Sequence, residues 1–245
     1  MSGHKTAIVV GVGAEIGIGG AVCKRFAREG YHVFIAGRTA EKIDAVRHAI
    51  TAAGGAATSV VTDTTKEAEV IRLFDTAEHA GHGPLEVVIY NAGNNFMKDI
   101  LDMDAEFFER VWRVGCFGGF LVGREAGRRM LPRGAGTLLF TGATGSLRGK
   151  PPFGSFASAK AGLRALCQTM ARDWGPKGIH VAHVIIDGGV NGDMIHSRFP
   201  DYLTRKGKDG MLDTDAIADA YWYLHTQHPT AWSLEVDLRP YKEPF

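Results

Sequence analysis

Four glycines near the start of the chain have a spacing that can bind the pyrophosphate of a dinucleotide. An apolar run, Ala7 to Val10, leads into glycines at positions 11, 13, 17 and 19, and an amphipathic segment from Ala21 to Glu29 follows. A strand, a glycine turn and a helix start let backbone N–H groups approach a phosphate, whose charge the helix N-terminus stabilises. Such turns also occur without a ligand, but we expect nucleotide binding here because the turn opens an alternating chain.

The end of the second predicted strand indicates which dinucleotide binds. Where such a strand, glycine turn and helix bind a dinucleotide, a carboxylate at the end of the second strand binds the 2′-hydroxyl of NAD, and an arginine accommodates the 2′-phosphate of NADP. The chain reads Ala36-Gly37-Arg38-Thr39, with no acid. Arg38 has a permanently charged, planar fork that suits a phosphate, and Thr39 adds a hydroxyl. We therefore predict NADP(H) over NAD(H); the alternative is that Arg38 is a solvated surface arginine.

Composition and charge argue against several classes of protein. The 245 residues carry a formal net charge of +1, so nothing suggests electrostatic binding to nucleic acid or to a membrane. The three cysteines have no metal or disulfide spacing. We expect no signal peptide, and no apolar run reaches the length needed to span a membrane. We expect a cytoplasmic protein that binds a small-molecule substrate and no metal.

Apolar and amphipathic segments alternate along most of the chain, which predicts an α/β fold. We expect a Rossmann-type, doubly wound three-layer sandwich with a mostly parallel sheet and helices on both faces. A single domain spans 1–245, with a substrate loop or lid at 188–210 and a tail at 239–245; an ordinary surface loop remains the alternative to the lid. The predicted strands are 7–10, 31–36, 57–61, 85–90, 137–141, 179–186 and 232–238.

One long predicted helix, Asp104 to Met130, contains five glycines, at positions 115, 118, 119, 123 and 127. Each costs about 1 kcal/mol relative to alanine in a helix interior. Close backbone approach to another helix or to a ligand would compensate, and we favour close packing, including packing across a subunit contact. A kinked or shortened helix is the alternative.

Asn91-Ala92-Gly93 follows the fourth predicted strand, and with this motif the chain resembles the short-chain dehydrogenase/reductase family over nearly its whole length. The glycine turn matches the family's T-G-x-x-x-G-x-G, with Val12 in place of the threonine. Asp63 stands where the family has an aspartate that contacts adenine. The resemblance implies a seven-stranded sheet and a homodimer or homotetramer. It also implies contact with the cofactor by Gly13, Gly17, Ile18, Gly19, Arg38, Thr39, Asp63, Asn91, Ala92, Gly93, Lys160, Gly188 and Val190.

The proton-transfer half of the family pattern is not matched. The family uses an Asn, a Ser and a Tyr-x-x-x-Lys; here Lys160 is present, but the tyrosine position is Phe156. Alignment places Gly142 at the serine and Gly115 at the asparagine. A phenyl ring has no ionisable proton, so Phe156 cannot be a general acid. Asp187 and Gly188 stand where the family has Pro-Gly.

Lys160, Thr141 and Asp187 are the candidate catalytic residues. Lys160 can bind the nicotinamide ribose or act as a proton donor itself, since a partly desolvated lysine titrates near neutrality. Thr141 can hydrogen-bond a substrate, and Asp187 can act as a base; alternatively both hold their own loops. His180 and His183 lie three residues apart on a strand and point to opposite faces, so they do not form a metal site.

Two functions fit these residues. The first is an NADP(H)-dependent oxidoreductase that acts on a small carbonyl or alcohol with a substituted proton relay. The second is an NADP(H)-binding protein without carbonyl reduction, either a non-redox isomerase or lyase or a cofactor sensor. The match to the family's cofactor-binding motifs and the presence of Lys160 favour the first function. The residues that replace the family's Asn, Ser and Tyr, at positions 115, 142 and 156, favour the second.

Overall fold

The computed structural model describes residues 5–93 and 95–243. Seven strands form one sheet in the order β3-β2-β1-β4-β5-β6-β7, and every neighbouring pair is parallel. This confirms the predicted α/β fold, with all seven strands parallel instead of most of them. The strands are β1 (Lys5–Val10), β2 (Tyr31–Gly37), β3 (Ala56–Val61), β4 (Leu85–Tyr90), β5 (Gly136–Thr141), β6 (Ile179–Ile186) and β7 (Glu235–Leu238).

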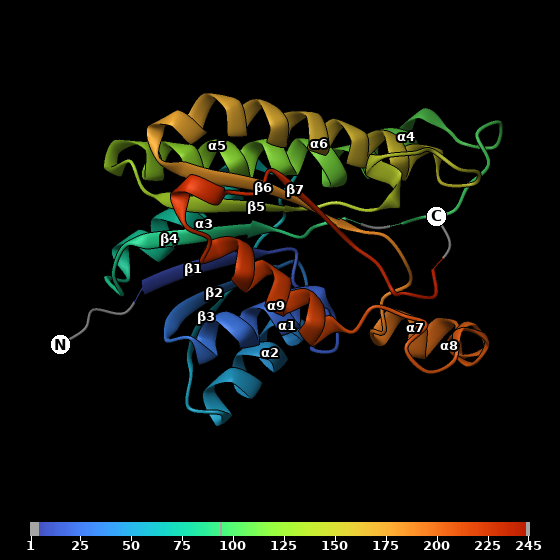
Figure 1. The fold of residues 1–245 in the computed structure, drawn as a ribbon, viewed down its shortest axis with the longest axis horizontal. Helices are drawn as coiled ribbons and strands as arrows, with labels where there is room; N and C mark the ends of the chain where they lie inside the picture. The colour runs from blue at the N-terminus through green and yellow to red at the C-terminus, as the bar shows by residue number, and fades with distance from the viewer. Residues whose placement is uncertain (1–4, 94, 244–245) are drawn as a thin grey trace.

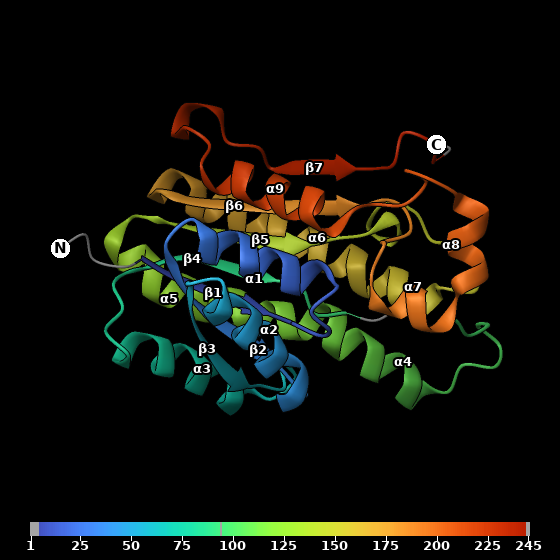
Figure 2. The same ribbon diagram turned by 90° about the horizontal axis from the view of Figure 1, so that it is seen from below.

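Helices cover both faces of the sheet, as Figures 1 and 2 show. Two buried apolar clusters fill the two interfaces, one on each side of the sheet. One face packs against α1 (Ile18–Arg28), α2 (Ala40–Ala52) and α9 (Thr214–His225). The other packs against α3 (Glu67–His79), α5 (Gly118–Met130) and α6 (Gly154–Trp174).

The long predicted helix is continuous but not uniform. It consists of α4 (Ala105–Trp112), a π-helical turn (Arg113–Phe117) and α5. Its glycines pack closely inside this chain: a Cβ on Gly119 would lie 2.3 Å from Leu163 of α6, and one on Gly123 would lie 2.8 Å from Met170. The prediction of close packing is therefore confirmed, and α6 supplies the contact.

The carboxyl ends of the parallel strands meet at one edge of the sheet. The strand order reverses between β1 and β4, and folds of this type bind ligands at that switch point. The loop after β6 lies at the same edge and carries two short helices, α7 (Asp193–Arg198) and α8 (Pro200–Lys206) (Figure 2). Short 3-10 turns complete the chain at Leu131–Arg133, Thr144–Ser146, Gly175–Lys177 and Pro229–Ala231. Within the described residues, no helix has the length and apolar character needed to cross a membrane.

Candidate active site

The glycine turn joins β1 to α1 and is held in place by the two residues that follow β4. Gly11 has a φ of 86° and approaches the backbone of Ala92 so closely that a Cβ would lie 2.3 Å from its nitrogen. The Asn91 side chain donates from Nδ2 to the Gly11 carbonyl oxygen at 3.1 Å. Asn91 and Ala92 therefore shape the turn, and their contacts require glycine at position 11.

The remaining glycines leave the start of α1 open. A Cβ on Gly13 would meet nothing within 4 Å, whereas one on Gly19 would lie 3.1 Å from Val12 Cα. Helix α1 begins at Ile18 after the extended residue Gly17, whose position has no side-chain cap. Its first N–H groups can therefore bind an anion, and a phosphate can approach the backbone at Gly13. These residues fit the pyrophosphate of a dinucleotide.

Three predicted adenosine-end residues lie at the ends of β2 and β3. Arg38 and Thr39 are exposed, and Thr39 precedes α2 without capping it through its side chain. Asp63 is partly buried and accepts hydrogen bonds from the Thr65 backbone at 3.0 Å and from its hydroxyl at 2.8 Å. Burial opposes ionisation of Asp63, but these bonds and the nearby Arg38 and Lys66 outweigh it and lower its pKa. The Arg38 guanidinium and the Asp63 carboxylate thus lie close together at the ends of β2 and β3.

Lys160 lies on α6 between the ends of β4 and β5. Its Nζ donates to the Thr141 carbonyl oxygen at 2.7 Å and would lie 3.0 Å from a Cβ on Gly93. The side chain is 3% exposed, and burial lowers the pKa of Lys160 to about 8. Nζ is 5.9 Å from the centre of the Phe156 ring. The amine thus stands beside the Asn91-Ala92-Gly93 motif.

The other two candidate catalytic side chains have partners elsewhere in the chain. The Thr141 hydroxyl lies 2.6 Å from the Tyr221 hydroxyl of α9, so only its carbonyl faces Lys160. Asp187 is buried and accepts hydrogen bonds from Thr144, Arg148 and Arg239. The structure therefore brings the Thr141 backbone, but not its hydroxyl, to Lys160, and it places Asp187 in an ion-pair cluster.

A buried network that the sequence analysis did not predict lies next to Gly142. His183 is 1% exposed; its Nε2 is 3.3 Å from Ser146 Oγ and its Nδ1 is 3.0 Å from Glu235 Oε2. Arg164 of α6 binds both Glu235 oxygens, at 2.6 and 2.7 Å. Burial lowers the pKa of His183 to about 4 despite Glu235, and Lys160 and Arg164 add to the effect. The ring is therefore a neutral base at neutral pH.

Comparison with known proteins assigns the family. Residues 5–203 match the family model described as short chain dehydrogenase. The chain is 33% identical over 184 residues to a short-chain dehydrogenase/reductase of Armillaria gallica, covering 74% of this chain and 69% of that protein. This protein is a short-chain dehydrogenase/reductase. It belongs to a family of oxidoreductases and has the Rossmann-like fold of that family.

Solved structures of the family superpose over almost the whole chain. A short-chain dehydrogenase from Rhodopseudomonas palustris is 41% identical, with a TM-score of 0.82 over 97% of this chain and 99% of that one. A metagenomic short-chain oxidoreductase in complex with NADP is 23% identical, with a TM-score of 0.81 over 96% of each chain. The second likeness concerns the fold alone.

Gly115, Gly142 and Phe156, which the sequence analysis matched to the family's asparagine, serine and tyrosine positions, are tightly packed. A Cβ on Gly115 would lie 2.7 Å from Ala159 of α6, and one on Gly142 would lie 2.3 Å from the His183 ring. The Phe156 ring packs beside Gly145, at 3.3 Å from the Cβ position of that glycine. Tyr90, another hydroxyl near this edge, is fully buried and donates to the Val114 carbonyl in the π-helical turn. It is a core residue.

The loop after β6 and the chain's tail pack over the same edge. The Asp193 N–H donates to the Ile16 carbonyl of the glycine turn at 2.8 Å, which docks the start of α7 there. Val190 bridges to Leu212, and a Cβ on Gly188 would lie 2.9 Å from Pro240 of the tail. The described part of the tail contacts its own chain through Lys206–Glu243 and Lys242. Residues 244–245 lie outside the described residues.

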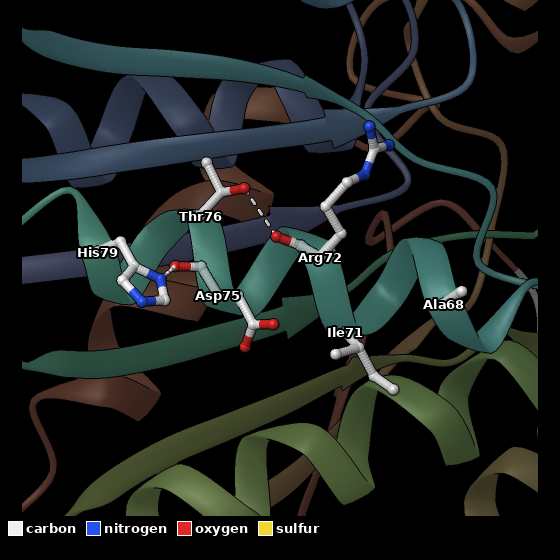
Figure 3. Close-up of a pocket in the computed structure, with 6 residues that line it drawn as sticks. All are labelled: Ala68, Ile71, Arg72, Asp75, Thr76 and His79. Carbon is white, nitrogen blue, oxygen red and sulfur yellow. Dashed lines mark hydrogen bonds between the residues drawn. The ribbon is translucent and has the colours of Figure 1, made fainter.

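The surface pocket drawn in Figure 3 lies apart from these residues. Among the residues that the structure describes, no group of three His, Cys, Asp or Glu side chains could hold a metal ion. The His180 side chain faces α9, and its Nε2 lies 2.9 Å from the Ser233 carbonyl oxygen. It therefore points to the opposite face of the sheet from His183, as predicted. The pocket in Figure 3 lies along α3, and none of its lining residues belongs to the predicted site: Ala68, Ile71, Arg72, Asp75, Thr76 and His79.

Proposed function

We propose that this protein is an NADP(H)-dependent oxidoreductase that interconverts a small alcohol and its carbonyl with an atypical proton relay. The observation that carries the proposal is the position of Lys160, whose buried amine stands between Thr141 and Gly93. This amine shares the edge of the sheet with the open glycine turn. The bound nicotinamide would supply hydride transfer, and the protein would supply binding, orientation and a proton.

The preference for NADP(H) rests on the end of β2. Arg38 is exposed there and close enough to Asp63 to help lower its pKa. A guanidinium can bind a 2′-phosphate through two parallel hydrogen bonds, and no acid follows β2 to bind a 2′-hydroxyl. The metagenomic relative of the same fold is complexed with NADP, which supports the same choice.

Lys160 would hold the nicotinamide ribose rather than replace the missing tyrosine. Its Nζ already donates to the Thr141 carbonyl and retains two further protons for ribose hydroxyls. The ring of Phe156 can pack near the substrate but cannot give or take a proton. Another group of this chain must therefore handle the substrate's proton.

A second function remains in competition: an NADP(H)-binding protein without carbonyl reduction, either a non-redox isomerase or lyase or a cofactor sensor. The specific observation in its favour is the absence of a hydroxyl or amide side chain at three packed positions, Gly115, Gly142 and Phe156. Both functions require the same bound cofactor, so only turnover separates them.

Two measurements on the full-length protein test this proposal. Calorimetry with NADPH and NADH reports cofactor binding, and absorbance of the reduced nicotinamide reports turnover with a panel of carbonyls and, using NADP⁺, a panel of alcohols. We expect turnover that survives Phe156→Ala and is lost in Lys160→Ala. Tight NADPH binding without turnover on either panel would favour the second function. Binding of neither dinucleotide would overturn both.

We also propose a homodimer or homotetramer in the cytoplasm, as family resemblance implies. Two aromatic side chains of α4 support a self-contact: Phe108 and Trp112 are about 40% exposed. Large apolar side chains that gather on an outer helix mark interaction surfaces. Sedimentation velocity of the purified protein would show a monomer if this proposal is wrong.

A further inference from the structure

The space that a serine side chain would need at position 142 is filled by polar atoms of other residues. A Cβ built on Gly142 would lie 2.3 Å from His183 Nε2 and 3.0 Å from Ser146 Oγ. Both atoms therefore converge on the point from which the family's serine would extend. Lys160 binds the carbonyl of the preceding residue, Thr141, so the amine and the imidazole flank the same strand end.

Hydrogen bonding fixes the direction in which this network can move a proton. Glu235 is held as a carboxylate by Arg164 and His183, which lower its pKa, so it accepts from Nδ1 of His183. With the ring proton on Nδ1, Nε2 is an acceptor, and Ser146 donates to it. The Ala143 N–H donates to Ser146 Oγ at 3.1 Å, which leaves the hydroxyl proton free to point at His183. This is the order hydroxyl, imidazole, carboxylate of a general-base relay.

We propose that Ser146 and His183, positioned by Glu235, form the proton relay that takes over the acid–base work for which Phe156 is unsuited. The inference rests on the proposed oxidoreductase function. Ser146 is the group that would touch the substrate oxygen, His183 is the base behind it, and Glu235 is a positioning residue that fixes the tautomer.

The relay accounts for every proton and electron when an alcohol is oxidised to a carbonyl. The substrate hydroxyl gives its proton to Ser146 Oγ while Ser146 gives its own to His183 Nε2, and the imidazolium is stabilised by Glu235. With oxidised nicotinamide bound, the hydrogen on the substrate carbon would leave to it with its bonding pair, and the electron pair left on oxygen by the departing proton would form the C=O bond. His183 then releases one proton to solvent. Carbonyl reduction follows the same steps in reverse.

The surroundings of His183 hold the ring in its neutral form, which is the form that can accept a proton. Lys160 and Arg164 approach from α6, Glu235 from β7 and Ser146 from the turn after β5. The two cations disfavour protonation and keep the ring neutral until the substrate proton arrives.

Two readouts test the relay, and the first is turnover. His183→Gln keeps a hydrogen-bonding side chain of similar length but cannot carry the proton, and we expect kcat to fall about 100-fold or more with little change in cofactor affinity. Ser146→Ala should act in the same direction, and Glu235→Gln should lower kcat and shift its pH profile. His180→Asn is the matched control, because His180 is equally buried on the same strand and faces α9. Turnover unchanged in His183→Gln would overturn the relay and leave the proposed function standing.

The second readout is ¹⁵N NMR of the histidine rings in the wild-type protein, which requires neither turnover nor a stable variant. We expect the Nδ1–H tautomer for His183, and a shift of its resonances on addition of NADP⁺ that His180 does not share. This result without turnover on either panel would overturn the proposed reaction and, with it, the role of Ser146 and His183 as its proton relay. An Nε2–H tautomer, or an unchanged His183 resonance with NADP⁺ bound, would overturn the relay.

Discussion

His183 occupies the volume in front of Gly142: a Cβ built on this glycine would lie 2.3 Å from both Cε1 and Nε2 of the imidazole. Since Gly142 N–H is bound to the Val184 carbonyl at 2.7 Å, the backbone cannot move away without breaking a sheet hydrogen bond. Gly142 and His183 are therefore a coupled pair, in which the absent side chain of one makes room for the ring of the other.

The first prediction concerns this pair. Gly142→Ser should destabilise the protein by about 1–3 kcal/mol, because the new side chain forces the buried ring out of place. Adding His183→Ala should recover part of that loss, giving a favourable coupling of about 1 kcal/mol or more in a double-mutant cycle. Urea denaturation of the four proteins measures it. Gly149→Ser is the control, since its Cβ would meet only ordinary contact, 3.9 Å from Ala157. If the effects of the two substitutions on the free energy of unfolding simply add, the ring of His183 moves aside freely.

A second prediction follows from the buried amine of Lys160. Burial lowers its pKa from the ordinary value of 10.5 to about 8, so between these pH values only the unfolded chain holds the proton. Stability should therefore rise with pH across this window, and the penalty for burying the charge should be fully present below it. Relative to Lys160→Met, the wild type should gain up to about 3 kcal/mol between pH 7 and pH 10.5.

Urea denaturation of the apo protein at several pH values measures this difference. Lys42→Met is the matched control, because Lys42 is exposed on α2 and its variant should differ from the wild type by a constant amount. A constant difference for Lys160→Met as well would mean that Lys160 stays charged in the folded protein.

Much of this fold could be predicted from the sequence, because strand and helix patterning is local. The glycine turn, the alternation and the close packing of the glycine-bearing helix each follow from residues within one or two turns of each other. The Ser146–His183–Glu235 network could not be predicted in this way. His183 and Glu235 are 52 positions apart and become neighbours only through the register of β6 and β7, where they are direct partners.

The placement of individual side chains was harder to predict than the backbone. Thr141 ends β5 as predicted, yet its hydroxyl turns to Tyr221 because alternate residues of a strand face opposite sides. The predicted strand at 232–238 is shorter and begins at Glu235, after a 3-10 turn. One available signal for the network was a histidine and an acid on the last two predicted strands.

The third prediction concerns cofactor choice. Arg38→Asp should weaken NADPH binding about 10- to 100-fold, because it replaces a charge-assisted phosphate contact by a like-charge repulsion. NADH binding should be kept or improved, since a carboxylate at the end of β2 can accept from the 2′-hydroxyl. Calorimetry with both dinucleotides gives the ratio of the dissociation constants. Arg28→Asp, an exposed change at the far end of α1, should leave that ratio as it was. A ratio that Arg38→Asp does not change would remove Arg38 from the cofactor site.

The last prediction separates two roles of Asp187. Its buried carboxylate joins the turn after β5 to the tail through Thr144, Arg148 and Arg239. Asp187→Asn removes the buried negative charge that Arg148 and Arg239 both contact, which should destabilise the protein by about 3 kcal/mol. Amide hydrogen exchange in 235–243 should become faster for the same reason.

Lys206→Met is the control, because it breaks only the more exposed ion pair of Lys206 with Glu243 and should change stability by less than about 1 kcal/mol. Denaturation, hydrogen exchange and turnover are measured on the same samples. Loss of turnover in Asp187→Asn with stability and exchange unchanged would contradict the structural role and assign the carboxylate to the chemistry, because a group that only anchors the tail cannot affect the reaction while the tail stays in place.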